Sequence, residues 1–101
     1  MKAVVLMKKE LEHILLKLNE HLVKRHQKEL ANVVFDFYNQ MSSSSWNSMV
    51  IRSEVKKFLQ MIDTETFSLS IQLTSEEREC LVRLREVSNP DKTNLAAYIS
   101  L

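Results

Sequence analysis

Apolar residues recur at helical spacing in three separate segments of the chain. The segment at residues 8–22 carries leucine and isoleucine every three or four positions, and lysine and glutamate fill its other face. The segments at residues 30–41 and 51–62 repeat the pattern with more aromatic residues. The apolar positions are Leu11, Ile14, Leu15, Leu18, Leu22, then Leu30, Val33, Val34, Phe37, Tyr38, Met41, then Ile51, Val55, Phe58, Leu59, Ile62. Each segment is predicted to form an amphipathic helix that buries its apolar stripe.

The junction between the first two segments, residues 23–29, contains neither glycine nor proline. The two apolar stripes are nearly in phase, so one helix over residues 8–41 is compatible with the pattern. Such a helix would be about 50 Å long at 1.5 Å per residue. Because a compact monomer of this size favours shorter helices, we expect a break near residues 24–28.

Four consecutive serines, residues 42–45, are expected to end the second helix, since serine side chains compete for backbone hydrogen bonds. Trp46 follows them, and we expect it to cover one end of the core with its indole N–H facing water. The third helix is expected to close at residues 63–66, Asp-Thr-Glu-Thr.

Residues 67–73 alternate strictly between apolar and polar side chains, which is the periodicity of a strand. No other segment of the chain offers a partner strand. We therefore expect an extended connection that lays Phe67, Leu69, Ile71 and Leu73 on the bundle. The alternative is an edge strand that pairs with another copy or with a partner protein.

A capping-box pattern opens the last long helix, with Thr74 as N-cap and Glu77 three residues later. The helix continues through Cys80, Leu84 and Val87 and is expected to stop at residues 88–90, Ser-Asn-Pro. Residues 89–101 then form either a short helix or a tail, since proline is favoured at the first helical position. The expected fold is all-α: an antiparallel four-helix bundle in one domain, residues 1–101, with the 67–73 connection and this C-terminal segment.

Composition supports the helical prediction and narrows the function classes. The chain has no glycine, which disfavours hairpin-rich β folds and excludes a glycine-rich phosphate loop. Its formal net charge is +1, whereas nucleic-acid binders usually carry a basic excess. The single cysteine, Cys80, excludes an internal disulfide and suits a reducing compartment. With no signal peptide or membrane span in the pattern, we expect a cytoplasmic protein.

Candidate catalytic and metal-binding residues are few. His13 and His21 are eight positions apart, about 12 Å along a helix, which is too far to share one metal ion. His21 and His26 are also poorly spaced, so we expect all three histidines at the surface. Cys80 lies among leucines, as a buried structural cysteine does. We therefore expect neither an enzyme nor a cofactor or metal site.

One basic cluster, residues 24–28 (Lys-Arg-His-Gln-Lys), suits contact with phosphates or, more simply, a solvated helix junction. No short two-helix unit with a suitable turn accompanies it, so we do not expect nucleic acid as a partner. The cluster still supports an alternative hypothesis. In that hypothesis the chain is a small helical regulator, able to form a homodimer, that binds nucleic acid or another protein.

Two segments carry a family resemblance: residues 51–59, IRSEVKKFL, and residues 71–87, IQLTSEERECLVRLREV. An amphipathic third helix, a connection and a leucine-rich last helix opened by threonine and acidic residues resemble the immunity proteins of class IIa (pediocin-like) bacteriocins, of the enterocin A immunity type. The resemblance implies a cytosolic four-helix bundle, at times peripheral to the membrane, that protects the producer cell. It also implies the partner, a membrane sugar-transporter receptor with bacteriocin bound, engaged from the cytosolic side.

The same resemblance points to a partner-binding region. The family recognises its target through the C-terminal helix and tail, which correspond to residues 83–101 in this chain. The polar and aromatic candidates there are Arg85, Lys92, Asn94 and Tyr98.

Overall fold

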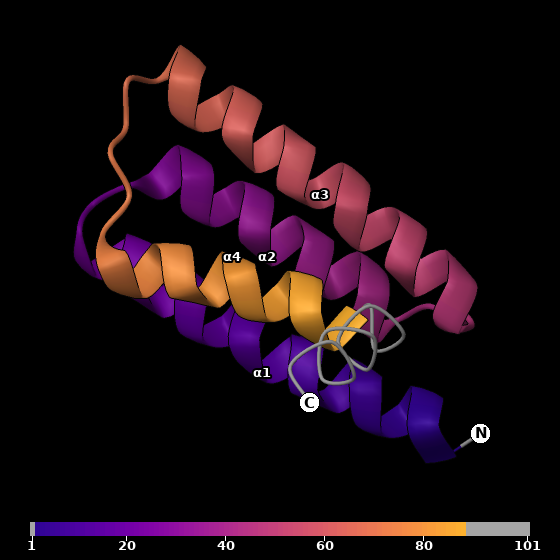
Figure 1. Cartoon of the computed structure of the whole chain (residues 1–101). Coiled ribbons are helices and arrows are strands. Elements are labelled where there is room, and N and C mark those ends of the chain that lie inside the picture. Colours follow the sequence, from indigo (N-terminus) through magenta and orange to yellow (C-terminus); the bar gives the residue numbers. More distant parts are fainter. Residues whose placement is uncertain (1, 89–101) are drawn as a thin grey trace, which may run out of the picture.

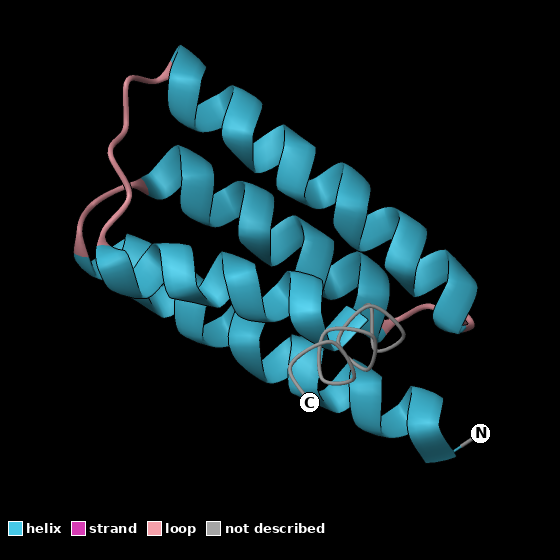
Figure 2. Cartoon of the chain, viewed as in Figure 1, coloured by secondary structure: helices cyan, strands magenta, loops and turns pink. Residues whose placement is uncertain are grey.

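The computed structural model describes residues 2–88, with side chains from residue 5 onward. These residues form four α-helices and contain no strand (Figures 1 and 2). The helices are α1 (Lys2–Lys24), α2 (Lys28–Ser42), α3 (Ser48–Ser68) and α4 (Ser75–Ser88). Consecutive helices run in opposite directions, and α1 packs on both α2 and α4 while α3 closes the other side (Figure 1). The predicted all-α antiparallel four-helix bundle is confirmed.

The core consists of the apolar stripes that the sequence shows. Leu11, Leu15, Leu22 and Ile51 are 0% exposed, and Cys80 and Leu84 of α4 close the same cluster. At one end, the rings of Phe37 and Phe58 stack with centroids 4.4 Å apart, and Trp46 lies 6.2 Å from Phe37. Trp46 is partly buried against the core, as expected.

The break between α1 and α2 is confirmed, and a glycine-free Schellman motif makes it. The Gln27 N–H donates to the carbonyl of Leu22 (2.9 Å) and the His26 N–H to that of Val23 (3.0 Å). This pairing requires a left-handed residue at the end of the helix, and His26 supplies it with φ 62°. The backbone therefore reverses at a residue type that only partly tolerates this conformation.

A second Schellman motif ends α3 later than the sequence predicts. The Ile71 N–H donates to the carbonyl of Thr66 (2.9 Å), and Ser70 takes φ 54°. Residues 63–66 do not stop the helix, because the hydroxyls of Thr64 and Thr66 bond to carbonyls within it, those of Gln60 and Asp63.

The connection thus covers residues 69–74, and the expected start at residue 67 is wrong. Phe67 belongs to α3 and is 88% exposed, so it does not pack on the bundle. Ile71 and Leu73 do pack against the core, as predicted. No strand forms in residues 2–88, so the edge-strand alternative finds no support there.

The serine segment behaves as expected at the end of α2. The hydroxyls of Ser43 and Ser44 donate to the carbonyls of Asn39 (2.8 Å) and Met41 (2.7 Å). Asn47 then caps α3 by accepting the Val50 N–H at 2.9 Å. Side chains of the loop thus form hydrogen bonds with free backbone groups at the end of α2 and at the start of α3.

Two further expectations concern the membrane and the C-terminal segment. Within residues 2–88, no helix has the length and apolar character needed to cross a membrane. The tail or short helix expected at residues 89–101 lies outside the described residues.

The left-handed residue at the α1 end provides a test of this fold. We expect His26→Gly to raise the free energy of unfolding by about 0.5–1 kcal/mol, because glycine adopts positive φ without a Cβ clash. The matched control is His13→Gly, at an exposed position inside α1, which should lower it by about 0.5 kcal/mol. Urea denaturation followed by circular dichroism measures both. Destabilisation by His26→Gly would contradict the assigned motif.

Candidate functional site

The start of α4 is held by a reciprocal capping box, as the sequence predicts. The Thr74 N–H donates to Oε1 of Glu77 (3.0 Å), and the Glu77 N–H donates to the Thr74 hydroxyl (3.2 Å). The carboxylate of Glu77 is nevertheless 0% exposed. A buried carboxylate needs further partners, since an unpaired buried charge is costly.

Arg25 supplies the principal partner from the loop between α1 and α2. Its Nε donates to Oε2 of Glu77 (2.8 Å) and its Nη2 to Oε1 (2.9 Å), a two-point fork. The same Nη2 donates to the carbonyl of Gln72 in the 69–74 connection (3.2 Å). One guanidinium therefore joins the end of α1, the connection and the start of α4.

His21, one turn before Arg25 on α1, completes the group. Its Nδ1 lies 3.3 Å from Oε2 of Glu77, and its Nε2 lies 2.7 Å from Oε2 of Glu76. Ionised carboxylates only accept hydrogen bonds, so both contacts are satisfied together when the imidazole is protonated. We call His21, Arg25, Glu76 and Glu77 the Glu77 cluster. His13 and His26 are exposed as predicted, and His21 is partly exposed, with 31% of its side chain accessible.

The Glu77 cluster shifts the pKa values of its members in the directions that favour charge. Burial acts to raise the pKa of Glu77, but hydrogen bonds from Arg25 and the Thr74 N–H, with the charge of Arg25, outweigh it and leave the pKa lowered. The hydrogen bonds of His21 to Glu76 and then to Glu77 raise the pKa of the imidazole. The ionised carboxylate of Glu77 and the protonated imidazole of His21 therefore both stabilise the fold at mildly acidic pH.

The polar atoms of this cluster are engaged with one another. Both carboxylate oxygens of Glu77 and both ring nitrogens of His21 already have partners. Among the described residues, no group of three or more His, Cys, Asp or Glu side chains is placed to hold a metal ion. Cys80 is 7% exposed, which confirms its buried position, and burial raises the pKa of its thiol.

The basic cluster at residues 24–28 is largely used within the fold. Lys24 Nζ lies 3.1 Å from Oε1 of Glu20, and Arg25 is committed to Glu77. Two of its cations are thus paired within the chain, Arg25 with a buried carboxylate and Lys24 with an exposed one.

A groove between α3 and α4 contains the one predicted partner-binding residue that the structure describes, Arg85. The groove has a volume of about 430 Å³ and is lined by Arg52, Lys56, Leu59, Gln60, Asp63, Arg85 and Ser88. We call it the α3–α4 groove. The other predicted residues, Lys92, Asn94 and Tyr98, lie outside the described part of the chain.

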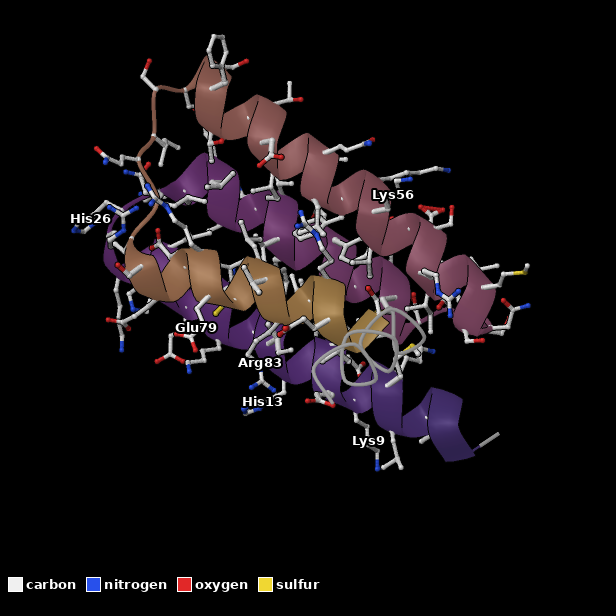
Figure 3. The ribbon with its side chains drawn as sticks, in the orientation of Figure 1. Lys9, His13, His26, Lys56, Glu79 and Arg83 are labelled. Atoms are coloured by element: carbon white, nitrogen blue, oxygen red, sulfur yellow. The ribbon has the colours of Figure 1, made fainter. Side chains whose placement is uncertain are left out.

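The register of the α3–α4 groove follows from one contact near the end of α4. Arg52 Nε donates to the carbonyl of Ser88 at 3.4 Å. Because the helices are antiparallel (Figure 1), Lys56, one turn after Arg52, lies across from Arg85, one turn before Ser88. Figure 3 shows Lys56 on α3, well away from His13, Glu79 and Arg83, which lie together on the α1 side of α4.

Sequence reasoning singled out Arg85 but neither Lys56 nor the groove that both residues line. A lysine on a polar helix face carries no signal of its own, and the groove exists only because two helices distant in sequence are brought together. The capping box gave the position of Glu77, but nothing local indicates a partner 52 residues earlier in the chain.

Comparison with protein-family models, with curated proteins and with solved structures finds no match to this chain. The fold and site therefore define the class of molecule, which over residues 2–88 is an all-α four-helix bundle with a basic groove beside the end of α4.

The buried carboxylate of the Glu77 cluster can be tested by a substitution that keeps the cap. Glu77→Gln retains a side chain that suits the capping box but leaves the half-buried Arg25 without its counter-charge. We expect a loss of about 2–3 kcal/mol in the free energy of unfolding, by chemical denaturation. The exposed control on the same helix, Glu79→Gln, should stay within about 0.5 kcal/mol of the unmodified protein. Equal effects of the two substitutions would contradict the assigned role.

The raised pKa of His21 predicts a pH dependence with a definite sign. The stabilisation is complete below the ordinary histidine pKa of about 6.5 and is lost as pH rises through the higher folded value. The melting temperature of the unmodified protein should therefore exceed that of His21→Gln most near pH 6, and the gap should narrow toward pH 9. Glu76→Gln should weaken the same trend. A gap that widens with pH would show that His21 is not stabilised as a cation.

Proposed function

We propose that this protein is a non-enzymatic immunity protein that protects a bacteriocin producer by binding. Its target is a membrane sugar-transporter receptor with a pediocin-like bacteriocin bound, engaged from the cytosolic side. Binding at the cytosolic face blocks the permeability change that the bacteriocin causes. The end of α4 and the α3–α4 groove form the binding surface on the described part of the chain.

The observation that carries the proposal is the position of Arg85. The resemblance points to the C-terminal helix as the recognition element, and Arg85 lines a groove of about 430 Å³ beside the end of that helix. Both ends of α4 are held in place on the bundle, because the Glu77 cluster fixes its start and Arg52 donates to the carbonyl of Ser88. The antiparallel four-helix arrangement is also the architecture that the resembled family implies.

The alternative, a small helical regulator that dimerises and binds nucleic acid or protein, has weaker support. Its argument depends on the basic segment at residues 24–28, and two of the cations there are paired with Glu20 and Glu77. Neutralising Arg25 would also destabilise the fold, because it would leave the buried Glu77 without its counter-charge. A fair test of nucleic-acid binding therefore substitutes Lys24 and Lys28 and leaves Arg25 in place.

Expression in a bacteriocin-sensitive strain tests the proposal directly. We expect the protein to raise the tolerated concentration of one pediocin-like peptide at least tenfold and to leave tolerance to unrelated pore-forming peptides unchanged. Growth inhibition across a panel of purified peptides measures this. Cells that express the folded Glu79→Gln variant provide the matched positive control.

Two results would count against the immunity proposal. One is the absence of protection against every pediocin-like peptide, with the folded protein present in the cells. The other is salt-dependent retention on DNA that Lys24→Gln with Lys28→Gln abolishes, which would favour the regulatory alternative.

A further inference from the structure

Two cations that face each other across the α3–α4 groove have no partner among the described residues. Lys56 and Arg85 form no ion pair or hydrogen bond there, although other charged side chains of the bundle, such as Arg25, Lys24 and Arg83, do. Two like charges placed across a concavity repel each other, and an anion between them removes that repulsion. The groove is therefore arranged to receive a negative group.

The rest of the groove limits what that negative group can belong to. Leu59, 8% exposed, contributes apolar surface, and Gln60 contributes an amide. Asp63 lies seven residues beyond Lys56 on the same helix, about 10 Å along the axis. A ligand with negative charge along its whole length would be repelled by Asp63, whereas a ligand with an acidic and a basic end can place its basic end beside Asp63.

A peptide fits these features better than a membrane surface does. Proteins that bind anionic lipid headgroups present cations on an exposed helix face or a polybasic segment. Here the cations line a concavity of about 430 Å³, within the range of sites that enclose small ligands, and an acidic residue shares it. A short peptide can carry an acidic and a basic group on separate flexible side chains, which can together span the roughly 10 Å between Lys56 and Asp63 along α3.

We propose that the α3–α4 groove binds a peptide segment with a carboxylate between Lys56 and Arg85, an apolar side chain on Leu59 and a basic group near Asp63. This assignment rests on the proposed function only in naming the source, a cytosol-facing segment of the receptor complex. Arg85 provides a planar fork for the carboxylate, and Lys56 provides a point charge from the other wall. Asp63 sets the direction in which the segment lies.

A tetrapeptide titration followed by amide chemical shifts of the full chain tests the groove by itself. The probe is acetyl-Glu-Leu-Ala-Lys-amide, and its control is the same peptide with glutamine in place of glutamate. We expect shifts centred on Lys56, Gln60 and Arg85 and at least fivefold weaker binding of the glutamine peptide. Lys56→Glu with Arg85→Glu should abolish the shifts.

The matched control is Lys9→Glu with Lys28→Glu, the same change of charge at exposed positions on α1 and α2, which should leave binding within about twofold. Circular dichroism checks that both double variants are folded. If Lys56→Glu with Arg85→Glu does not fold, Lys56→Gln with Arg85→Gln takes its place. Equal binding of the two peptides, or shifts that persist without the two cations, would overturn the proposal. Binding to phosphatidylglycerol vesicles that requires Lys56 and Arg85, without peptide shifts, would assign the groove to lipid and also overturn it.

The protection assay separates this inference from the proposed function. If the unmodified protein protects cells, Lys56→Glu with Arg85→Glu should reduce protection at least tenfold, and Lys9→Glu with Lys28→Glu should not. Full protection by the groove variant would overturn the groove assignment while leaving the immunity proposal intact. Lack of protection by the unmodified protein would overturn the immunity proposal, and the tetrapeptide titration would still decide the groove.

Discussion

The buried contact between Glu77 and Arg25 is the interaction on which the arrangement of this bundle depends. It connects residues 52 positions apart, from the loop after α1 to the first turn of α4. Without it, α4 would be placed on α1 by apolar contacts and by more exposed polar contacts such as that of Arg83 with Glu10 (3.0 Å). Apolar contacts tolerate sliding along a helix. A two-point fork between a guanidinium and a carboxylate does not, because both hydrogen bonds require one orientation. The contact with Gln72 extends the same constraint to the connection.

This ion pair is a means of fixing position more than a source of stability. Removing two charges from water costs several kcal/mol, which their attraction offsets only when the geometry is good and the remaining atoms have partners. Here the Thr74 N–H and His21 also contact the carboxylate oxygens of Glu77 that Arg25 binds. Glu77 thus serves two structures with one side chain, since it caps its own helix and anchors another. Few residue types could do both, because a capping position requires an acceptor and the fork requires two.

The sequence predicts the helices of this fold well and their ends less well. Amphipathic stripes identify the core residues of α1, α2 and α3, and the capping box identifies the start of α4, because these signals lie within a few residues of each other. The turns after α1 and α3 are harder to predict. Glycine normally marks a left-handed helix end, but here His26 and Ser70 take that conformation. The alternation over residues 67–73 resembled a strand because Phe67 and Ser68, the last residues of α3, continue the apolar and polar alternation of the connection that follows. Contacts between distant segments, including the Glu77 cluster and the α3–α4 groove, leave no local pattern at all.

The two ends of α4 use charge in opposite ways. At its start, the buried carboxylate of Glu77 is paired with Arg25 and His21, and these contacts hold that end of the helix in place. Toward its end, Arg52 bonds to the Ser88 carbonyl, while Lys56 and Arg85 face the groove without a partner among the described residues. A cation in the last turn is also favoured by the helix dipole, so Arg85 destabilises the fold little while the groove holds no ligand. A helix can hold a recognition surface at a fixed distance from the rest of the bundle when its start is held in place and its other end carries cations that face a groove.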